Sequence, residues 1–264
     1  MNLNIKSILS LCVLLAIYSC NEDEKQTVVT KTQLVMSEEF NTNGAPDSSL
    51  WSYDIGNGNN GWGNNELQNY TDNSANIKIE DGMLKITAIK QGSTYTSARI
   101  QTKGKFEKKY GRIEARIKMP YGKGLWPAFW MLGANSGTVA WPQCGEIDIM
   151  EYLGSKPTSI FGSVHGPGYS GGEAITKNYT LSNDRFDNDF HVFGIEWDEN
   201  YINYYVDNVL YNQITPDTVP GEWVFNQSFY LILNMAVGGR FPGSPNSSTV
   251  FPQTMLVDYV RVYQ

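Results

Sequence analysis

The chain has 264 residues, and its 20 Lys and Arg against 27 Asp and Glu give a formal net charge of −7. This balance argues against nucleic-acid binding, which needs clustered basic side chains. Because 41% of the residues are apolar and only 18% are charged, the composition also excludes a disordered chain. The 25 Gly residues favour a turn-rich β protein, and seven Trp, 16 Tyr and 11 Phe exceed what a core of this size needs.

Residues 1–19 have the pattern of an export signal. Lys6 precedes an apolar run over residues 8–18, which is shorter than the roughly 20 residues that span a bilayer. Residues 17–20 (IYSC) resemble a bacterial lipoprotein signal, in which cleavage precedes the cysteine and lipid is attached to it. We therefore expect lipid on Cys20, with an ordinary secretory signal cut near the same place as the alternative.

The residues after Cys20 indicate where the protein works. The acidic residues 21–24 (NEDE) resemble the surface-export signal of bacterial lipoproteins. The following residues are polar and lack periodicity, so we interpret residues 20–33 as a tether. The protein is expected to be exported and anchored to the outer membrane through its N-terminal lipid alone, facing the outside.

Residues 34–264 show the period-two alternation that predicts β-strands, in one domain without internal repeats. In residues 112–119 (RIEARIKM) the apolar side chains share one face and the charged ones the other, as in a strand with one solvated side. Tight turns are indicated by Asp81-Gly82 and Asp207-Asn208. This pattern implies a sandwich or barrel, with further strands at residues 83–89, 98–102, 128–132, 146–152, 160–165, 191–197, 201–206, 230–237 and 256–263.

The segment of residues 57–76 is rich in Asn and Gly and is too polar for a core strand. Long loops on a rigid sheet often carry binding groups, but many are only solvated connectors. Trp62 and Tyr70 within this loop favour the rim of a binding cleft. Both interpretations stay open at the level of the sequence.

Three carboxylates follow one another in the expected strand 146–152. Because strand side chains alternate, Glu146 and Asp148 share a face, whereas Glu151 falls on the other. A β-bulge at Ile149-Met150 would absorb one extra residue and return Glu151 to the face of the first two. The bulge is therefore a structural prediction that follows from requiring a single chemical site.

Such a site suits retaining hydrolysis of a glycosidic bond, which uses two carboxyl groups about 5–5.5 Å apart. We assign Glu146 as the nucleophile, Glu151 as the general acid and then base, and Asp148 as the group that orients and tunes Glu146. Three neighbouring carboxyls cannot all ionise cheaply, so at least one pKa should be raised. The alternatives are the solvent face of an edge strand and a calcium site.

Aromatic residues next to the acidic strand favour a sugar-binding site over these alternatives. Trp126, Trp130 and Trp141 lie shortly before Glu146, and indole faces match the apolar faces of sugar rings. His165 lies on a turn-rich segment where a hydrogen-bonding role is expected. His191, between apolar residues, is interpreted as a core histidine.

Four segments together resemble family sixteen glycoside hydrolases, and the laminarinase-like endo-β-1,3-glucanases most of all. They are residues 110–116 (YGRIEAR), 124–133 (GLWPAFWMLG), 141–151 and 165–172 (HGPGYSGG). The likeness extends from Glu39 to Tyr263. It implies an all-β jelly-roll of two curved antiparallel sheets with a cleft on the concave face, retaining chemistry by the three acids, and no catalytic cofactor. Met150 is the residue that lichenase-like members lack.

The resemblance also implies particular site residues. Those matching positions that line the sugar subsites are Asn64, Arg99, Trp126, Trp130, Trp141 and His165. Many relatives bind a structural calcium on the convex side, and Glu39, Gly82 and Asp258 fall where its ligands are expected.

The implied function is a monomeric enzyme that cuts internal β-1,3-glucosidic bonds of laminarin-type polysaccharides. Mixed-linkage β-1,3-1,4-glucan is the alternative substrate. A galactan is disfavoured, because the extra basic residues expected for sulfated chains are missing. A non-catalytic glycan-binding sandwich is the alternative of a different class, although binding alone does not need three carboxylates.

Overall fold

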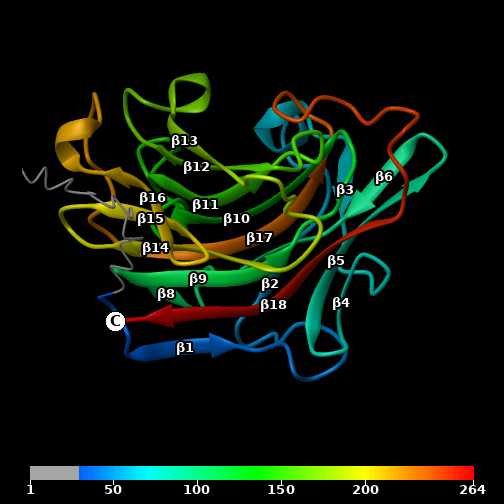
Figure 1. Cartoon of the computed structure of the whole chain (residues 1–264), viewed down its shortest axis with the longest axis horizontal. Coiled ribbons are helices and arrows are strands. Elements are labelled where there is room, and N and C mark those ends of the chain that lie inside the picture. Colours follow the sequence, from blue (N-terminus) through cyan, green and yellow to red (C-terminus); the bar gives the residue numbers. More distant parts are fainter. Residues whose placement is uncertain (1–29) are drawn as a thin grey trace, which may run out of the picture.

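The computed structural model describes residues 30–264, which form two sheets packed face to face (Figure 1). The expected export signal, Cys20 and most of the tether lie outside the described residues. Within residues 30–264, no helix has the length and apolar content needed to cross a membrane. The pairs within each sheet are antiparallel except for the parallel pair of β3 and β6.

The first sheet has ten strands and contains both ends of the described chain. Its order is β16 (Val209–Ile214), β15 (Ile202–Val206), β14 (His191–Trp197), β9 (Gly111–Lys118), β18 (Gln253–Tyr263), β5 (Met83–Gln91), β6 (Thr94–Ser97) and β3 (Gln68–Tyr70), while β1 (Leu34–Glu38) pairs with β18 and β4 (Ile77–Glu80) with β5.

The second sheet has eight strands and carries the expected acids. Its order is β13 (Ile175–Thr180), β12 (Ser159–His165), β11 (Glu146–Tyr152), β10 (Leu125–Gly133), β17 (Phe229–Val237), β7 (Arg99–Gln101) and β2 (Ser52–Asp54), while β8 (Glu107–Lys108) pairs with β17. Short helical turns lie at η1 (Gly61–Asn65), η2 (Gly171–Glu173) and η3 (Pro216–Thr218).

The core lies between the two sheets and is built from alternate residues of their central strands. Ile113 and Ile117 of β9 are fully buried, as are Phe129 of β10 and Ile147 of β11. Burying one such side chain contributes about 1.5–3 kcal/mol, so this layer holds the two sheets in a fixed relation. The opposite face of the eight-stranded sheet is left free to present polar groups.

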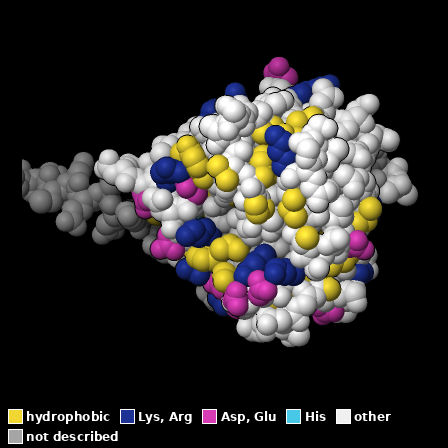
Figure 2. Space-filling model, turned by 90° about the vertical axis from the view of Figure 1, so that its right-hand side faces the viewer, with side chains coloured by type: hydrophobic (Ala, Val, Ile, Leu, Met, Phe, Trp, Pro, Cys, Tyr) yellow, Lys and Arg dark blue, Asp and Glu magenta, His cyan; other side chains and the backbone are white. Residues whose placement is uncertain are grey.

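Charged side chains on the outside are mixed with hydrophobic ones at the end of the molecule that carries β4, β5 and β6 (Figure 2). This end includes the ion pairs Lys78–Glu80 and Lys85–Asp81, at 2.8 and 2.7 Å. Exposed pairs of this kind contribute at most about 1 kcal/mol each. They therefore matter little for the fold.

The structure confirms all ten strands expected from the alternation, with ends that shift by up to three residues. Both predicted turns are also present, with positive φ at Asp81 (59°), Gly82 (71°), Asp207 (49°) and Asn208 (65°). The sequence pattern missed short or polar strands such as β13, whose residues are mostly exposed and do not alternate.

Two expectations from the sequence are wrong. Residues 68–70 form a strand inside the expected loop, and Gln68 and Tyr70 are fully buried. Their polar groups are satisfied there, because Gln68 Oε1 accepts from the Val237 N–H and the Tyr70 hydroxyl donates to Glu66. The charged face of β9 is not wholly solvated either. Arg112 and Glu114 are only 5% and 6% exposed, and they form an ion pair of 2.7 Å to which the Tyr263 hydroxyl adds a hydrogen bond.

The end of the expected tether lies against the ten-stranded sheet. The backbone N–H groups of Thr30 and Lys31 donate to the buried Glu196 carboxylate, at 2.8 and 3.1 Å. Gln33 pairs with Gln264 through both backbone groups. Residues 30–33 are therefore part of the folded domain.

Candidate active site

A bulge in β11 brings the three acids to one face of the eight-stranded sheet. Across β11, residues 132, 130 and 128 of β10 pair with Glu146, Asp148 and Glu151, and Ile149 has no partner there. Residues 165, 163 and 161 of β12 pair with the same acids, again with a register shift between 148 and 151. Partners spaced by two residues share a face, so the acids do too. The predicted bulge at Ile149-Met150 is confirmed.

Both bulge residues point into the core. Ile149 and Met150 are 1% and 0% exposed and belong to the hydrophobic layer between the sheets. Burying two consecutive apolar side chains on the same side compensates for the broken ladder. The hydrophobic pattern of the sequence thus selects the bulge.

Each of the two glutamates is held by an indole. The Trp141 Nε1–H donates to Glu146 Oε2 at 3.1 Å, and the Trp126 Nε1–H donates to Glu151 Oε1 at 3.1 Å. Two of the residues expected from the resemblance to contact sugar therefore hold the acids directly. Trp141 itself is 47% exposed, which leaves much of its ring free.

His165 lies against one oxygen of Asp148 and the second oxygen of Glu146. Its Nε2 is 3.0 Å from Asp148 Oδ2 and 3.5 Å from Glu146 Oε1. The ring is also 5.8 Å from that of Trp141, centre to centre. The histidine predicted to hydrogen-bond is therefore placed among the acids.

Burial raises the pKa of all three acids. For Glu146, burial and the charge of Asp148 raise the pKa to about 8, while His165 acts in the opposite direction. Burial alone raises the pKa of Asp148 to about 8, and burial with the charge of Asp148 does the same for Glu151. The expectation of at least one raised pKa is confirmed, and the group retains protons at neutral pH.

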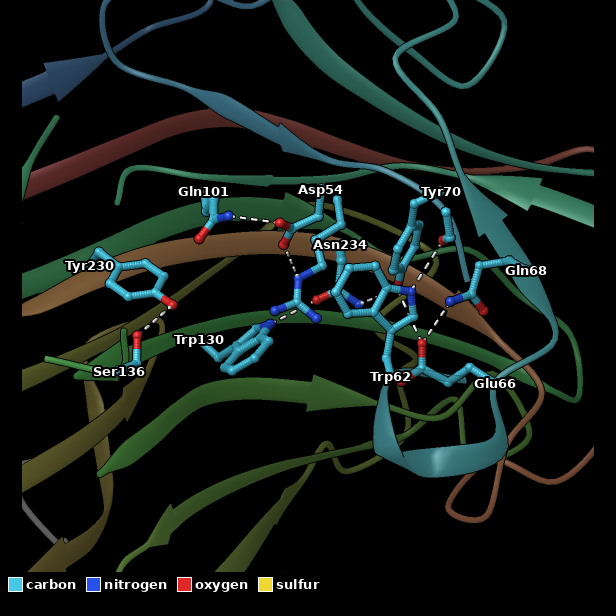
Figure 3. A network of polar contacts seen from close by, with 12 residues as sticks. Asp54, Trp62, Glu66, Gln68, Tyr70, Gln101, Trp130, Ser136, Tyr230 and Asn234 are labelled. Atoms are coloured by element: carbon cyan, nitrogen blue, oxygen red, sulfur yellow. Dashed lines mark hydrogen bonds and ion pairs between the residues drawn. The ribbon is translucent and has the colours of Figure 1, made fainter. Parts of the chain in front are cut away.

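Arg99 lies beside the acids, between two indoles. Its guanidinium is 4.7 Å from the Trp62 ring and 4.8 Å from the Trp130 ring, and its Nε is 2.8 Å from Asp54 Oδ2 (Figure 3). Gln101 donates to the other Asp54 oxygen at 2.7 Å. This stack gives a flat wall with polar edges, which suits a sugar ring.

The Asn-rich loop is fixed to this wall through Glu66. The Glu66 carboxylate accepts from Gln68 Nε2 at 2.6 Å and from Asn64 Nδ2 and the Tyr70 hydroxyl at 3.4 Å (Figure 3). Tyr70 in turn accepts from Asn234 Nδ2 at 3.1 Å. Of the two interpretations of this loop, the structure favours the rim of a site, because Trp62 covers Arg99.

The network reaches the strand beside the acids. Trp130 Nε1 donates to Asn234 Oδ1 at 2.7 Å, and Trp130 pairs with Asp148 across the sheet (Figure 3). The loop is thus connected by hydrogen bonds to the Trp130 indole, on the strand that pairs with the acids, so the loop's position is coupled to that of the indole.

Sequence reasoning missed several groups at the site. Asp54 and Glu66 hold predicted residues, and Phe161 and Phe241 each contribute an aromatic edge. Phe241 is 42% exposed and lies 5.5 Å from the rings of both Trp126 and Phe161. The alternation of β12 could have identified Phe161, which lies opposite Glu151, but nothing local marks Phe241.

One group of possible metal ligands is present among the described residues. Glu146, Asp148 and His165 each offer an atom, and these atoms lie within 4.8 Å of one another. The Trp141 indole already occupies one Glu146 oxygen. His165 Nδ1 accepts from the backbone N–H of Gly171, so its Nε2 carries the proton and faces the acids as a donor, not as a metal ligand. The group is therefore better described as two acids beside a donor than as an ion site.

The residues expected to hold calcium lie around β18. β9 occupies one edge of this strand, and β5 and β1 pair with consecutive parts of its other edge, with Leu84 opposite Val257 and Glu38 opposite Val260. The segments that carry Gly82 and Glu39 therefore meet at this edge, next to Asp258. Both Glu39 oxygens bind Arg261, at 2.8 and 2.9 Å. Asp258 Oδ2 binds Arg116 at 2.7 Å. The Glu39 carboxylate thus does not fit a calcium site, whereas Asp258 keeps one free oxygen.

Comparison with known proteins gives consistent matches. A family model described as Glycosyl hydrolases family 16 matches residues 59–260. The chain is 40% identical to a beta-glucanase of Rhodothermus marinus, over 88% of this chain and 85% of that protein. It is 38% identical to glucan endo-1,3-beta-glucosidase A1 of Niallia circulans, covering 88% of this chain but 38% of that longer protein. The laminarinase catalytic domain of Thermotoga maritima matches with a TM-score of 0.84 at 50% identity, over 88% of this chain and 98% of that domain.

Proposed function

Because the chain belongs to glycosyl hydrolase family 16, we propose that it is an endo-acting hydrolase of internal β-1,3-glucosidic bonds in laminarin-type polysaccharides. The named activities of its relatives support the substrate. The observation that carries the reaction is the bulge, which places Glu146 and Glu151 on one face. The chemistry needs carboxyl groups and water, and no catalytic cofactor.

The proposed reaction is a double displacement with retention. The Glu146 carboxylate attacks the anomeric carbon while Glu151 gives its proton to the glycosidic oxygen that leaves. Water then attacks the glycosyl ester, Glu151 takes its proton, and Glu146 is released. Trp126 and Trp141 orient these two acids through their indole N–H groups.

The raised pKa values suit these roles. With a pKa of about 8, Glu151 is protonated at neutral pH and can act as a general acid. Glu146 must ionise to attack, and the positive charge that develops on the sugar ring favours its anion inside a buried site. Asp148, between them, tunes Glu146 through its charge.

A product profile distinguishes the candidate substrates. The wild type should release reducing ends from laminarin faster than from mixed-linkage glucan or agarose, and Glu146→Gln should lose nearly all of this activity. Faster cleavage of mixed-linkage glucan would favour the alternative substrate. If the purified protein retains laminarin on a native gel but releases no sugar from it, the protein is instead a non-catalytic glycan-binding sandwich.

Export, anchoring and oligomeric state are further parts of the proposal. We infer a monomer that is lipidated at Cys20 and displayed on the outer membrane, because residues 17–24 have the pattern of a lipoprotein signal. Fatty-acid labelling in cells should mark the wild type and not Cys20→Ala. An unlabelled wild-type chain in the culture medium would contradict the anchor, and a dimer mass by light scattering would contradict the monomer.

A structural calcium is proposed with a reduced ligand set. The free Oδ1 of Asp258 and the main-chain carbonyls of Glu39 and Gly82 are the groups that would hold it, because the Glu39 carboxylate is taken by Arg261. Calcium at 100 times its Kd should raise the Tm by about 5 °C. Asp258→Ala should abolish the shift, and equal Tm values for the wild type in calcium and in EDTA would contradict the site.

A further inference from the structure

His165 accepts a hydrogen bond on one ring nitrogen, and this determines what the other can do. The backbone N–H of Gly171 donates to His165 Nδ1 at 3.1 Å. A ring nitrogen that accepts such a bond carries no proton, so the proton of the neutral imidazole lies on Nε2. The side of the ring that faces the acids is therefore a donor.

The segment after His165 is built so that this donor cannot turn away. Gly166 and Tyr169 exchange both backbone hydrogen bonds, each at 3.0 Å, and Tyr169 is fully buried. The Tyr169 hydroxyl donates to the carbonyl of Glu222 at 2.7 Å. Gly171 itself has a φ of +57°, which aims its N–H at the ring.

We propose that His165 is a positioning residue that presents a fixed N–H to the Glu146–Asp148 pair and thereby favours the ionised nucleophile. This inference rests on the proposed hydrolysis and deepens it. It gives His165 a role towards the acids in addition to the sugar contact that the family resemblance implies. The distances of 3.0 and 3.5 Å from Nε2 place the donor between the two carboxyls.

The surroundings explain why one donor matters. Asp148 is 4% exposed, and its Oδ2 makes no well-aligned hydrogen bond, although His165 Nε2 approaches it to 3.0 Å. The charged groups that act on Glu146 are Asp148 and Glu151 of the same strand, His165 of β12 and Arg99 of β7. Arg99 is already paired with Asp54, and the Trp141 indole donates to Glu146 Oε2, so His165 is the donor that approaches Asp148 and the other oxygen of Glu146.

The proton position can be measured without any substrate. In ¹⁵N–¹H spectra of the wild type, the His165 ring should show an unprotonated Nδ1 and a protonated Nε2. The chain has two histidines, so His191→Gln leaves a single ring to assign. A protonated Nδ1 at His165 would overturn the proposal, whether or not the protein cleaves laminarin.

The effect on the acids is tested by pH profiles of kcat/KM on laminarin for His165→Leu and His165→Gln. Removing the N–H should move the acidic limb up by about one pH unit in the Leu variant, because the charged carboxyls lose a donor. The Gln amide reaches as far as Nε2 and should restore the wild-type limb. His191→Gln, far from the acids on β14, is the control and should keep it.

Other outcomes count against the inference. If both His165 variants keep the wild-type limb and only raise KM, His165 contacts sugar alone and the proposal is wrong. Equal shifts in the Leu and Gln variants would also overturn it, because the donor would then not be the cause. A wild type without activity would refute the proposed function, and the spectra would still decide the proton position.

Discussion

Deleting Met150 would convert the bulge into a regular strand without separating the acids. With one residue fewer, Glu146, Asp148 and Glu151 stand at every second position, so alternation alone keeps them on one face. In the wild type, the five residues 128–132 of β10 lie opposite the six residues 146–151 of β11; in the deletion variant the two strands would pair one to one. The single deletion should therefore fold and keep measurable hydrolysis.

The cost of this deletion comes from the core. Met150 is 0% exposed, and the loss of a buried side chain of this size costs about 2–5 kcal/mol including the cavity it leaves. For a domain of this length, about 2–4 °C of Tm is lost for each kcal/mol. Activity should fall by less than the deletion of an acid would cause, because no carboxylate changes face.

Deleting both Ile149 and Met150 is the matched comparison. With both residues removed, Glu151 follows Asp148 directly. Because neighbouring side chains of a regular strand point to opposite faces, Glu151 would then point towards the core. Loss of the general acid should lower kcat by about 10²–10⁴-fold, and the buried carboxylate should destabilise the fold further. Laminarin hydrolysis and thermal melts of both variants give the readout. A folded single deletion without activity, or an active double deletion, would refute the reasoning.

Three further predictions follow from the site. Activity on laminarin should fall as the pH rises through about 8, because Glu151 then loses the proton it donates, and a wild-type profile that stays flat to pH 10 would argue against this role. Glu151→Gln should have a higher Tm than the wild type at pH 8. A carboxyl whose pKa is raised in the folded state contributes stability at low pH, and this contribution is lost between about pH 4 and 8. Equal Tm values of the variant and the wild type at pH 8 would count against burial as the cause of the raised pKa. Trp130→Phe should cost about 1–3 kcal/mol and raise KM, because Asn234, which is 7% exposed, loses its donor; equal stability in urea would show that the bond is dispensable.

The acids and their bulge could be predicted because their signals are local. Strand alternation fixes the faces of Glu146, Asp148 and Glu151, and a single extra residue leaves only one position for the irregularity. The burial of Ile149 and Met150 follows from the same few residues. The requirement that the three acids share a face and the burial of the two apolar residues therefore both indicate the same bulge in this strand.

The walls of the site depend on contacts between distant segments. Arg99 meets Asp54 and Trp62 only after β2, β7 and the loop are assembled, and no spacing in the sequence encodes this meeting. Phe241 reaches Trp126 from a loop with no regular pattern. The buried charges of Arg112 and Glu114 were missed for the same reason, since Tyr263 comes from the other end of the chain.

Trapping the glycosyl-enzyme tests the central claim most directly. A 2-deoxy-2-fluoro laminaribiosyl fluoride should form a stable ester, and peptide mapping by mass spectrometry should place it on Glu146. Glu151→Ala should give the same adduct, because fluoride leaves without a proton from Glu151. An adduct on Asp148, or none on an enzyme that cleaves laminarin, would show that Glu146 and Glu151 do not divide the reaction between them as the bulged strand arranges them.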